Sequence, residues 1–372
     1  MGGDKAPLVL LAAGGTGGHL FPAEALASAL KRRGIEVDLA TDERATRYGH
    51  DFPAREIHVI PSATIRGRDP VSMAKTVVTL GLGAMKALRL MCRIRPAAVV
   101  GFGGYPTLPP VLAATLRRIP TVIHDANAVM GRANKLLSSR VSAIATSFPG
   151  MTLDAPLAAK ASFTGNPVRP MVIQAAGEPY PALDDRGAIR LLVFGGSQGA
   201  RVTSDIVPSA VETMSPDLRA RLAVVQQARD EDETRVRETY ARLGVKAEVA
   251  PFFSDLPSRI AAAHLIVSRS GASTVAELAA IGRPAILVPL PHALDQDQLA
   301  NANVLAKAGG AIVLKQDDFT PERLANEITC LATDPGKLPA MAAGAKSAGV
   351  LDAADRLADL VLRVANVVPA SR

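Results

Sequence analysis

Two segments of this chain share one layout: an apolar strand, a glycine-rich turn and the start of a helix. The first runs from Leu8 to Pro22 and contains GGTGG at 14–18, and the second, IRLLVFGGSQGA, runs from Ile189 to Ala200. Glycines let the backbone approach a ligand closely, and the first N–H groups of a helix favour a phosphate or a sugar oxygen. Because the two copies divide the chain into similar halves, we predict two Rossmann-like, doubly wound α/β domains that face each other across a ligand-binding cleft.

The rest of the composition agrees with α/β layers and excludes several other classes. Apolar residues make up 48% of the chain but aromatic residues only 3%, so the cores are expected to be aliphatic. Cys92 and Cys330 are far apart and form no metal-ligand spacing, which argues against a disulfide scaffold or a structural metal site. Charged residues interrupt the most apolar stretch at Lys75, Lys86 and Arg89, and the first apolar run leads into glycines, so neither a membrane span nor a signal peptide is expected.

The net charge of +7 favours an anionic partner, which could be a nucleotide, a nucleic acid or an acidic membrane surface. A basic adaptor for nucleic acid or membrane would bind in a salt-sensitive way. The chain has no tryptophan and only four tyrosines, so it lacks the aromatic platforms on which single-stranded bases stack. We therefore expect no nucleic-acid partner.

His19 follows the first glycine turn and is the candidate general base, because an imidazole titrates near neutral pH. Two further polar segments follow predicted strands in the first half: GFGGY at 101–105, with Gly103, Gly104 and Tyr105, and HDAN at 124–127. The carboxyl ends of parallel strands meet at one edge of a sheet, so these segments are expected to converge with the first turn. Each would otherwise be an ordinary turn or helix cap.

The second half offers groups suited to a nucleotide sugar. Gly271 permits close approach of the backbone, Arg269 offers a cation to a diphosphate, and Glu277 offers a carboxylate to ribose hydroxyls. The stretch 289–303 supplies Asp297, Gln298 and Asn301 for the hydroxyls of a sugar. Asp295 and Asp297 also have the spacing of a metal-binding Asp-x-Asp pair, although acids at a helix start commonly complement the helix dipole.

Two other patterns leave alternatives open. Asp42 follows the second predicted strand, where a dinucleotide-binding protein places its ribose-binding acid, so an NAD(P)-dependent oxidoreductase is the alternative function. The segment 71–95 places Met85, Leu88 and Cys92 on one helical stripe and basic residues on the next. Such a helix either covers a sheet or rests on an anionic bilayer.

Six motifs, taken together and in this order, resemble the MurG family of peptidoglycan glycosyltransferases. They are GGTGGH at 14–19, HDAN at 124–127, TGNPVR at 164–169, GGSQGA at 195–200, SRSGASTVAE at 268–277 and DQDQLANAN at 295–303. The resemblance implies a GT-B fold and an inverting transfer of N-acetylglucosamine from UDP-N-acetylglucosamine to the 4-hydroxyl of a lipid-linked muramyl-pentapeptide. It also implies a peripheral protein on the cytoplasmic face of the inner membrane, which favours the membrane interpretation of 71–95. We expect no cofactor and no metal.

The resemblance also implies which residues contact the substrates. Those on the UDP-sugar are Thr16, Gly17, Gly18, Asn127, Arg169, Ser197, Gln198, Phe253, Arg269, Glu277 and Gln298. On the acceptor side we expect Asp125 together with Gly103, Gly104 and Tyr105, which follow a predicted strand end. The chain departs from the family twice. Asp125-Ala126 replaces the usual Glu-Gln, so one carboxylate is a methylene shorter and one amide is missing. Asp297-Gln298 replaces paired glutamines, so a carboxylate stands where an amide would both donate and accept.

The domain organisation follows from the positions of the motifs. We predict an N-terminal acceptor and membrane-associated domain at 1–165, a hinge at 166–188 and a UDP-sugar domain at 189–348. A C-terminal helix at 349–372 is expected to pack back on the N-terminal domain. In the predicted reaction His19 takes the proton of the acceptor hydroxyl while helix N-termini, Ser197 and Arg269 stabilise the departing diphosphate.

Overall fold

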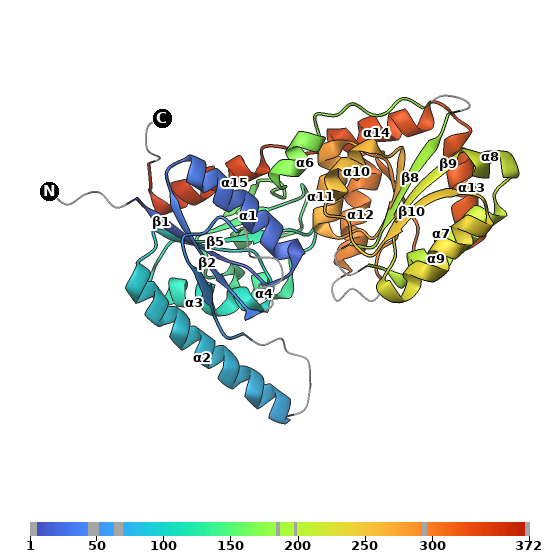
Figure 1. The fold of residues 1–372 in the computed structure, drawn as a ribbon. Coiled ribbons are helices and arrows are strands. Elements are labelled where there is room, and N and C mark those ends of the chain that lie inside the picture. Colours follow the sequence, from blue (N-terminus) through green and yellow to red (C-terminus); the bar gives the residue numbers. More distant parts are fainter. Residues whose placement is uncertain are drawn as a thin grey trace. The chain divides into compact units, whose positions relative to one another are not determined.

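The computed structural model describes residues 6–43, 52–62, 70–183, 187–196, 199–291 and 296–368, with the backbone alone at 70–75 and 77. The chain forms two compact units (Figure 1). Unit 1 comprises Met1–Arg169 together with Leu351–Arg372, and unit 2 is Pro170–Val350. Each unit is built around its own parallel sheet with helices packed against it, as the repeated strand, turn and helix predicted.

The sheet of unit 1 has the order β3-β2-β1-β4-β5-β6-β7, and its strands are parallel. The strands are β1 (Leu8–Ala12), β2 (Glu36–Thr41), β3 (Ile57–Val59), β4 (Ala98–Gly101), β5 (Thr121–Asp125), β6 (Ala143–Thr146) and β7 (Ala161–Phe163). The order reverses between β1 and β4, and open α/β sheets bind ligands beyond the carboxyl ends of such strands. The first glycine turn leaves β1 at this point.

The helices of unit 1 cover both faces of this sheet. They are α1 (Gly17–Arg32), α2 (Pro70–Ile94), α3 (Leu108–Leu116), α4 (Arg132–Ser138), α5 (Ala155–Ala158) and α15 (Ala353–Ala365), with a 3-10 turn at Tyr105–Thr107. Val9 and Leu11 of β1 pack in one core with α1 and α15. Leu10 and Ala12 pack in the other core with α2 and α3. Strand β1 is therefore apolar at every position because both of its faces are buried.

Unit 2 repeats the design with the order β10-β9-β8-β11-β12-β13. Its strands are β8 (Ile189–Phe194), β9 (Leu222–Gln227), β10 (Lys246–Ala250), β11 (Leu265–Ser268), β12 (Ala285–Leu287) and β13 (Ala311–Val313). Its helices are α6 (Pro170–Ala175), α7 (Arg201–Thr213), α8 (Pro216–Arg221), α9 (Asp230–Arg242), α10 (Leu256–Ala262), α11 (Ala272–Ile281), α12 (Asp297–Lys307), α13 (Pro321–Ala332) and α14 (Lys337–Ser347), with a 3-10 turn at Gln316–Asp318. The order reverses between β8 and β11, so the second glycine turn also leaves the sheet at a switch point.

A buried arginine anchors the first residues of unit 2. The Arg283 guanidinium donates to the carbonyls of Glu178 and Pro179 and also to those of Ala261 and Ile281. Five N–H donors on a planar fork suit this set of convergent carbonyls. The described part of the predicted hinge beyond Pro170 therefore belongs to unit 2.

Candidate active site

The first glycine turn opens onto an N-terminus of α1 that no side chain caps. Thr16 occupies the N-cap position, yet its hydroxyl makes no capping hydrogen bond and lies 3.1 Å from His19 Nδ1 instead. A Cβ on Gly18 would meet no atom within 4 Å, so the turn is open on that side. The N-cap side chain therefore leaves the first N–H groups of α1 uncapped, which is the arrangement that suits an anionic ligand.

The structure brings Gly103 and Gly104 against the His19 ring, as the sequence predicted for their strand ends. Both glycines have positive φ, +82° and +74°. A Cβ on Gly103 would lie 3.4 Å from His19 Nε2, and one on Gly104 would lie 3.4 Å from His19 Cε1. Since Nδ1 faces Thr16, the opposite ring nitrogen lies on the side of these glycines. Tyr105 follows directly and is half-buried in the 3-10 turn.

Asp125, predicted on the acceptor side, is buried beneath a loop. The residue is 2% exposed. It accepts hydrogen bonds from the backbone N–H of Asn127 at 3.1 Å, from that of Gly131 at 2.8 Å and from Asn134 Nδ2 at 2.9 Å. These bonds make it the buried anchor of the 125–131 loop, while its contact with the acceptor stays a prediction. Asn127, half-buried on that loop, is positioned by Asp125.

Asn134, which lies outside the predicted motifs, and His124 of the HDAN motif support this loop. Asn134 also donates to the His124 carbonyl. His124 is fully buried, and its Nε2 lies 3.1 Å from Ser147 Oγ and 3.3 Å from the Gly165 carbonyl. Burial lowers the pKa of His124 to about 4, with a smaller lowering from the nearby charge of His19 and an opposing contribution from the Gly165 carbonyl. The apolar residues that precede His124 in β5 were the sequence signal that this histidine is buried.

Arg169, the last residue of the first segment of unit 1, lies near the same helix terminus. Its guanidinium is 4.1 Å from the centroid of the Phe21 ring on the first turns of α1. A Cβ on Gly17 would come within 2.9 Å of that ring, so Gly17 leaves room for it. The structure thus places the predicted residues Gly17, Gly18, His19 and Arg169 around one end of α1.

In unit 2, the second glycine turn requires glycine at its first residue. A Cβ on Gly195 would lie 2.2 Å from the Ala200 backbone nitrogen. Gly196 and Gly199 have φ of +82° and +67°, which disfavours other residues. Ser197 and Gln198, both predicted to contact the UDP-sugar, lie outside the described residues.

The Arg269 guanidinium is used within the protein. It donates to the carbonyls of Val288 at 3.1 Å and Pro289 at 3.0 Å, and to Gln316 Oε1 at 2.5 Å. Burial lowers its pKa. The side chain thereby holds the 288–289 segment next to the loop that carries Gly271, and the contact of its charge with a diphosphate stays a prediction.

The remaining predicted residues surround that loop. Glu277 is buried in α11, and Gly271 is the residue before this helix. Gln298 Oε1 accepts a hydrogen bond from the Leu290 N–H at 3.1 Å, and its carbonyl accepts one from Ser270 Oγ at 2.8 Å. Asn301, expected to bind a sugar hydroxyl, is fully buried and donates to the Ser270 carbonyl, so it supports this loop.

The Asp-x-Asp alternative and Phe253 complete the predicted set. Asp295 lies outside the described residues, and Asp297 accepts from the Gln298 N–H in the first turn of α12, as a helix-terminal acid does. Phe253 is buried with the Arg259 guanidinium 4.3 Å from its ring centroid.

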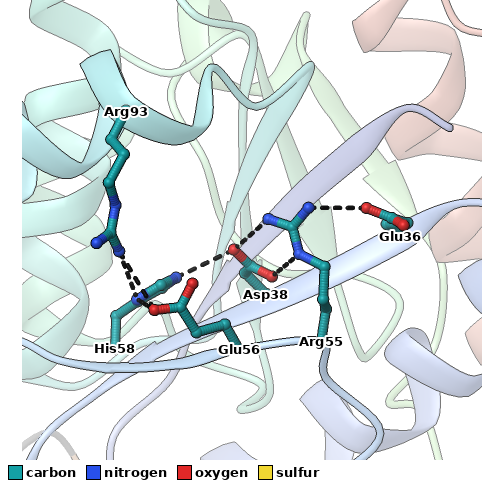
Figure 2. A network of polar contacts seen from close by, with 6 residues as sticks. All are labelled: Glu36, Asp38, Arg55, Glu56, His58 and Arg93. Atoms are coloured by element: carbon teal, nitrogen blue, oxygen red, sulfur yellow. Dashed lines mark hydrogen bonds and ion pairs between the residues drawn. The ribbon is translucent and has the colours of Figure 1, made fainter. Parts of the chain in front are cut away.

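A separate cluster in unit 1 has metal-ligand residue types, Asp38, Glu56 and His58 (Figure 2). Arg55 binds both Asp38 oxygens, through Nε at 3.0 Å and a terminal nitrogen at 2.9 Å, and Arg93 lies 3.3 Å from Glu56. Burial raises the pKa of Asp38, but hydrogen bonds from Arg55 and His58 outweigh it and the pKa is lowered. Two guanidinium groups already balance these carboxylates, so the cluster is an ion-pair network that joins β2, β3 and α2.

Comparison with known proteins agrees with these features. The glycosyltransferase family 28 N-terminal domain matches residues 9–146, and the family 28 C-terminal domain matches residues 190–357. Two relatives carry the name UDP-N-acetylglucosamine--N-acetylmuramyl-(pentapeptide) pyrophosphoryl-undecaprenol N-acetylglucosamine transferase. The one from Rhodopseudomonas palustris (strain BisB5) is 64% identical over 98% of this chain and 100% of its own. The one from Nitrobacter hamburgensis is 60% identical over 97% and 98%.

Among solved structures, MurG from Acinetobacter baumannii superposes with a TM-score of 0.78 at 30% identity, covering 96% of this chain and 99% of its own. Together with the two parallel sheets, this match confirms the predicted GT-B fold. The chain therefore belongs to glycosyltransferase family 28 and, within it, to the MurG transferases.

Proposed function

We propose that the protein transfers N-acetylglucosamine from UDP-N-acetylglucosamine to N-acetylmuramyl-(pentapeptide) pyrophosphoryl-undecaprenol, the step from lipid I to lipid II in peptidoglycan synthesis. The observation that carries this function is the identity of 60% or more to transferases of that name over nearly the whole chain. The matched family domains include both glycine turns. The dinucleotide alternative based on Asp42 accounts for only the first.

The direct test is UDP release from UDP-N-acetylglucosamine by the purified full chain, with and without the lipid-linked acceptor. We expect release that depends on the acceptor. Binding of UDP without release would indicate another acceptor, and nicotinamide binding without UDP binding would restore the oxidoreductase alternative.

His19 is our candidate for the general base in an inverting displacement. The acceptor 4-hydroxyl attacks the anomeric carbon, the hydroxyl proton passes to the imidazole, and the sugar–phosphate bond breaks with UDP as the leaving group. The contact of His19 with Thr16 and the two glycines beside its ring support this assignment, because they fix the position of the ring beside the first glycine turn. General base catalysis contributes roughly 10²- to 10⁴-fold to the rate.

His19→Ala should therefore lose turnover by about that factor while it keeps its affinity for UDP-N-acetylglucosamine. Single-turnover kinetics and equilibrium titration measure the two quantities separately. Wild-type turnover in this variant would remove His19 from the mechanism.

We assign acceptor binding to unit 1 and UDP-sugar binding mainly to unit 2. On the acceptor side, Gly103, Gly104 and Tyr105 adjoin His19. On the nucleotide side, Glu277 would accept from ribose hydroxyls, and the N-termini of α7 and α11 would stabilise the charge that grows on the diphosphate. Gln298 and the backbone at Phe253 complete the proposed contacts.

We also propose that α2 rests on an anionic membrane surface at the cytoplasmic face of the inner membrane. One side of α2 packs in the core of unit 1 through Ala87, Leu90 and Met91. On the other side Val78, Leu82 and Met85 are 61%, 54% and 45% exposed, a spacing that aligns them along the helix. The helix thus covers the sheet and also presents an apolar stripe.

Basic residues accompany this stripe. Lys86, Arg89 and Arg93 line a cavity of about 300 Å³ together with His58 and neighbouring apolar residues. Exposed apolar side chains flanked by cations match the interface of an anionic bilayer. In the part of the chain that the structure describes, no helix has both the length and the apolar character needed to cross a bilayer.

Sedimentation with vesicles of anionic phospholipid tests the membrane proposal. Leu82→Glu/Met85→Glu and Lys86→Ser/Arg89→Ser should each reduce binding several-fold, while transferase activity on detergent-solubilised acceptor stays at the wild-type level. The control is Lys307→Ser/Lys337→Ser, which removes the same charge from exposed positions of unit 2. Unchanged sedimentation of both α2 variants would rule out this surface.

A further inference from the structure

We infer that Arg229 is a diphosphate-binding residue for the UDP-sugar, an assignment that rests on the proposed function. Arg229 lies just beyond the end of β9, the strand that pairs with β8 on the side away from β11. The second glycine turn leaves β8 and is therefore flanked by the end of β9 on one side and by the end of β11 on the other. Arg229 is the cation on the β9 side.

The contacts of Arg229 join it to the far end of the turn. A terminal guanidinium nitrogen donates to the Gly199 carbonyl at 3.3 Å. The aliphatic part of the side chain packs against Gly199, where a Cβ would lie 3.0 Å from Arg229 Cγ. Any residue larger than glycine at 199 would therefore displace the arginine, in addition to the strain of its positive φ.

Gln227, the last residue of β9, holds the near end of the turn. Gln227 Oε1 accepts a hydrogen bond from the Gly195 N–H at 3.0 Å, and Gln227 Nε2 donates to the Pro251 carbonyl. Gln227 at the end of β9 and Arg229 just beyond it thus contact Gly195 and Gly199, which lie on either side of residues 197–198. Backbone held in this way is preorganised for a ligand, which lowers the entropic cost of binding.

The charge of Arg229 is more available to a ligand than the charge of Arg269. The Arg269 guanidinium donates to two carbonyl oxygens and one amide oxygen of the protein. Arg229 is 40% exposed, and its closest acid, Glu231, is 3.7 Å away and mostly exposed. The next two acids of α9, Asp232 and Glu233, pair with Arg235 and Arg237. A weak exposed pair contributes little, so a diphosphate competes for this guanidinium on favourable terms.

Calorimetric titration of the full chain with UDP and with uridine tests the inference, since uridine lacks the diphosphate. Arg229→Met should weaken UDP binding roughly tenfold and leave uridine binding unchanged, because only the charge-assisted contact is lost. Arg229→Gln keeps an amide that can donate to the Gly199 carbonyl but removes the charge. It should likewise weaken UDP binding and leave uridine binding unchanged. The control is Arg242→Met at the other end of α9, which pairs with Glu212 and should bind both ligands as the wild type does.

Wild-type affinity for UDP in Arg229→Gln would overturn the inference, as would an equal loss of UDP and uridine binding in both Arg229 variants. Failure of the wild-type chain to bind either ligand would instead contradict the proposed function. Thermal unfolding of each variant identifies any that is not folded, and the other Arg229 variant then gives the result.

Discussion

At the scale of single residues, Thr16 departs from the usual behaviour of its position. A threonine at an N-cap normally accepts from a backbone N–H of the first turn, but this hydroxyl faces His19 Nδ1. A hydroxyl that accepts from Nδ1–H fixes the tautomer in which Nε2 carries the lone pair. We predict this tautomer for His19; its basic nitrogen would then lie on the side of Gly103 and Gly104, where the acceptor is proposed to bind.

Replacing Thr16 with valine should therefore lower kcat by about tenfold, because the imidazole loses the group that sets its tautomer and orientation. The pH–rate profile should shift as well. Thr16→Ser keeps the hydroxyl and is the matched control, with kcat close to wild type. Equal loss in the serine and valine variants would show that the threonine methyl, and not the hydroxyl, matters.

Glu277 is the residue on which the ribose assignment depends. Removing its carboxylate in Glu277→Ala should weaken UDP binding by about tenfold or more, because a buried charge-assisted hydrogen bond is lost. Titration with 2′-deoxy-UDP, which lacks one of the two ribose hydroxyls, tests the same contact. The variant should no longer distinguish the two nucleotides, and an unaltered dissociation constant for UDP would refute the ribose role.

Residue types and spacing predicted which segments meet, but not where each side chain points. Gly103, Gly104 and His19 come together because strand ends of a parallel sheet share one edge. The orientation of Arg269 depends on Gln316, 47 residues further along the chain, and no local pattern shows that partner. Asp125 and Asn301 likewise become supporting residues through bonds to loops whose course the sequence does not reveal.

At the scale of elements, α15 completes the core of unit 1 from the far end of the chain. Leu357 and Val361 are fully buried in the core that α1 and β1 share. Arg33 of the α1 terminus is 2.7 Å from Asp355 and 3.0 Å from Asp359. The buried apolar side of α15 fixes its packing against α1, while these partly exposed ion pairs contribute little to stability.

Leu357→Ala should lower the free energy of unfolding by about 2–5 kcal/mol, because it leaves a cavity between α15 and α1. Denaturant titration followed by circular dichroism measures the change. Asp359→Ala on the exposed face is the control and should cost less than about 1 kcal/mol. A loss below about 1 kcal/mol in Leu357→Ala would mean that α15 is not part of the cooperative core.

The sequence predicted which helices and strands form more completely than it predicted what packs against each of them. Strand, glycine turn and helix were evident at both switch points because burial on two faces demands uninterrupted apolar strands. For α2 the sequence allowed either a helix on a sheet or a helix on a membrane. In the structure α2 has one face packed in the core of unit 1 and one exposed apolar stripe. Which residues of α2 are buried depends on its packing against α3, and the sequence of α2 alone does not reveal that contact.

At the scale of the whole molecule, buried histidines make stability depend on pH. The pKa of His124 is about 4 in the folded protein, below the value of about 6.5 for an unfolded chain. Protonation therefore favours the unfolded state: the full contribution is present above pH 6.5 and is lost as the pH falls toward 4. Burial also lowers the pKa of His264 in unit 2, which acts in the same direction.

We expect the free energy of unfolding to fall by up to about 3 kcal/mol from His124 alone between pH 6.5 and 4. Denaturant titrations at several pH values measure this slope. His124→Gln should flatten it. Asp38 and Asp355, with lowered pKa values, lose their contributions only as the pH falls below about 3.8, outside this window. A slope unaffected by His124→Gln would contradict the assignment.

The central claim is that the protein transfers N-acetylglucosamine to the 4-hydroxyl of a lipid-linked muramyl acceptor with inversion. The most direct measurement is nuclear magnetic resonance of the lipid product formed from UDP-N-acetylglucosamine labelled with ¹³C in the sugar. We predict a new linkage between the labelled anomeric carbon and the muramyl 4-oxygen, in the β configuration opposite to that of the UDP-sugar. A product with the original α configuration would contradict the single displacement, and the absence of label from the lipid fraction would contradict the transfer itself.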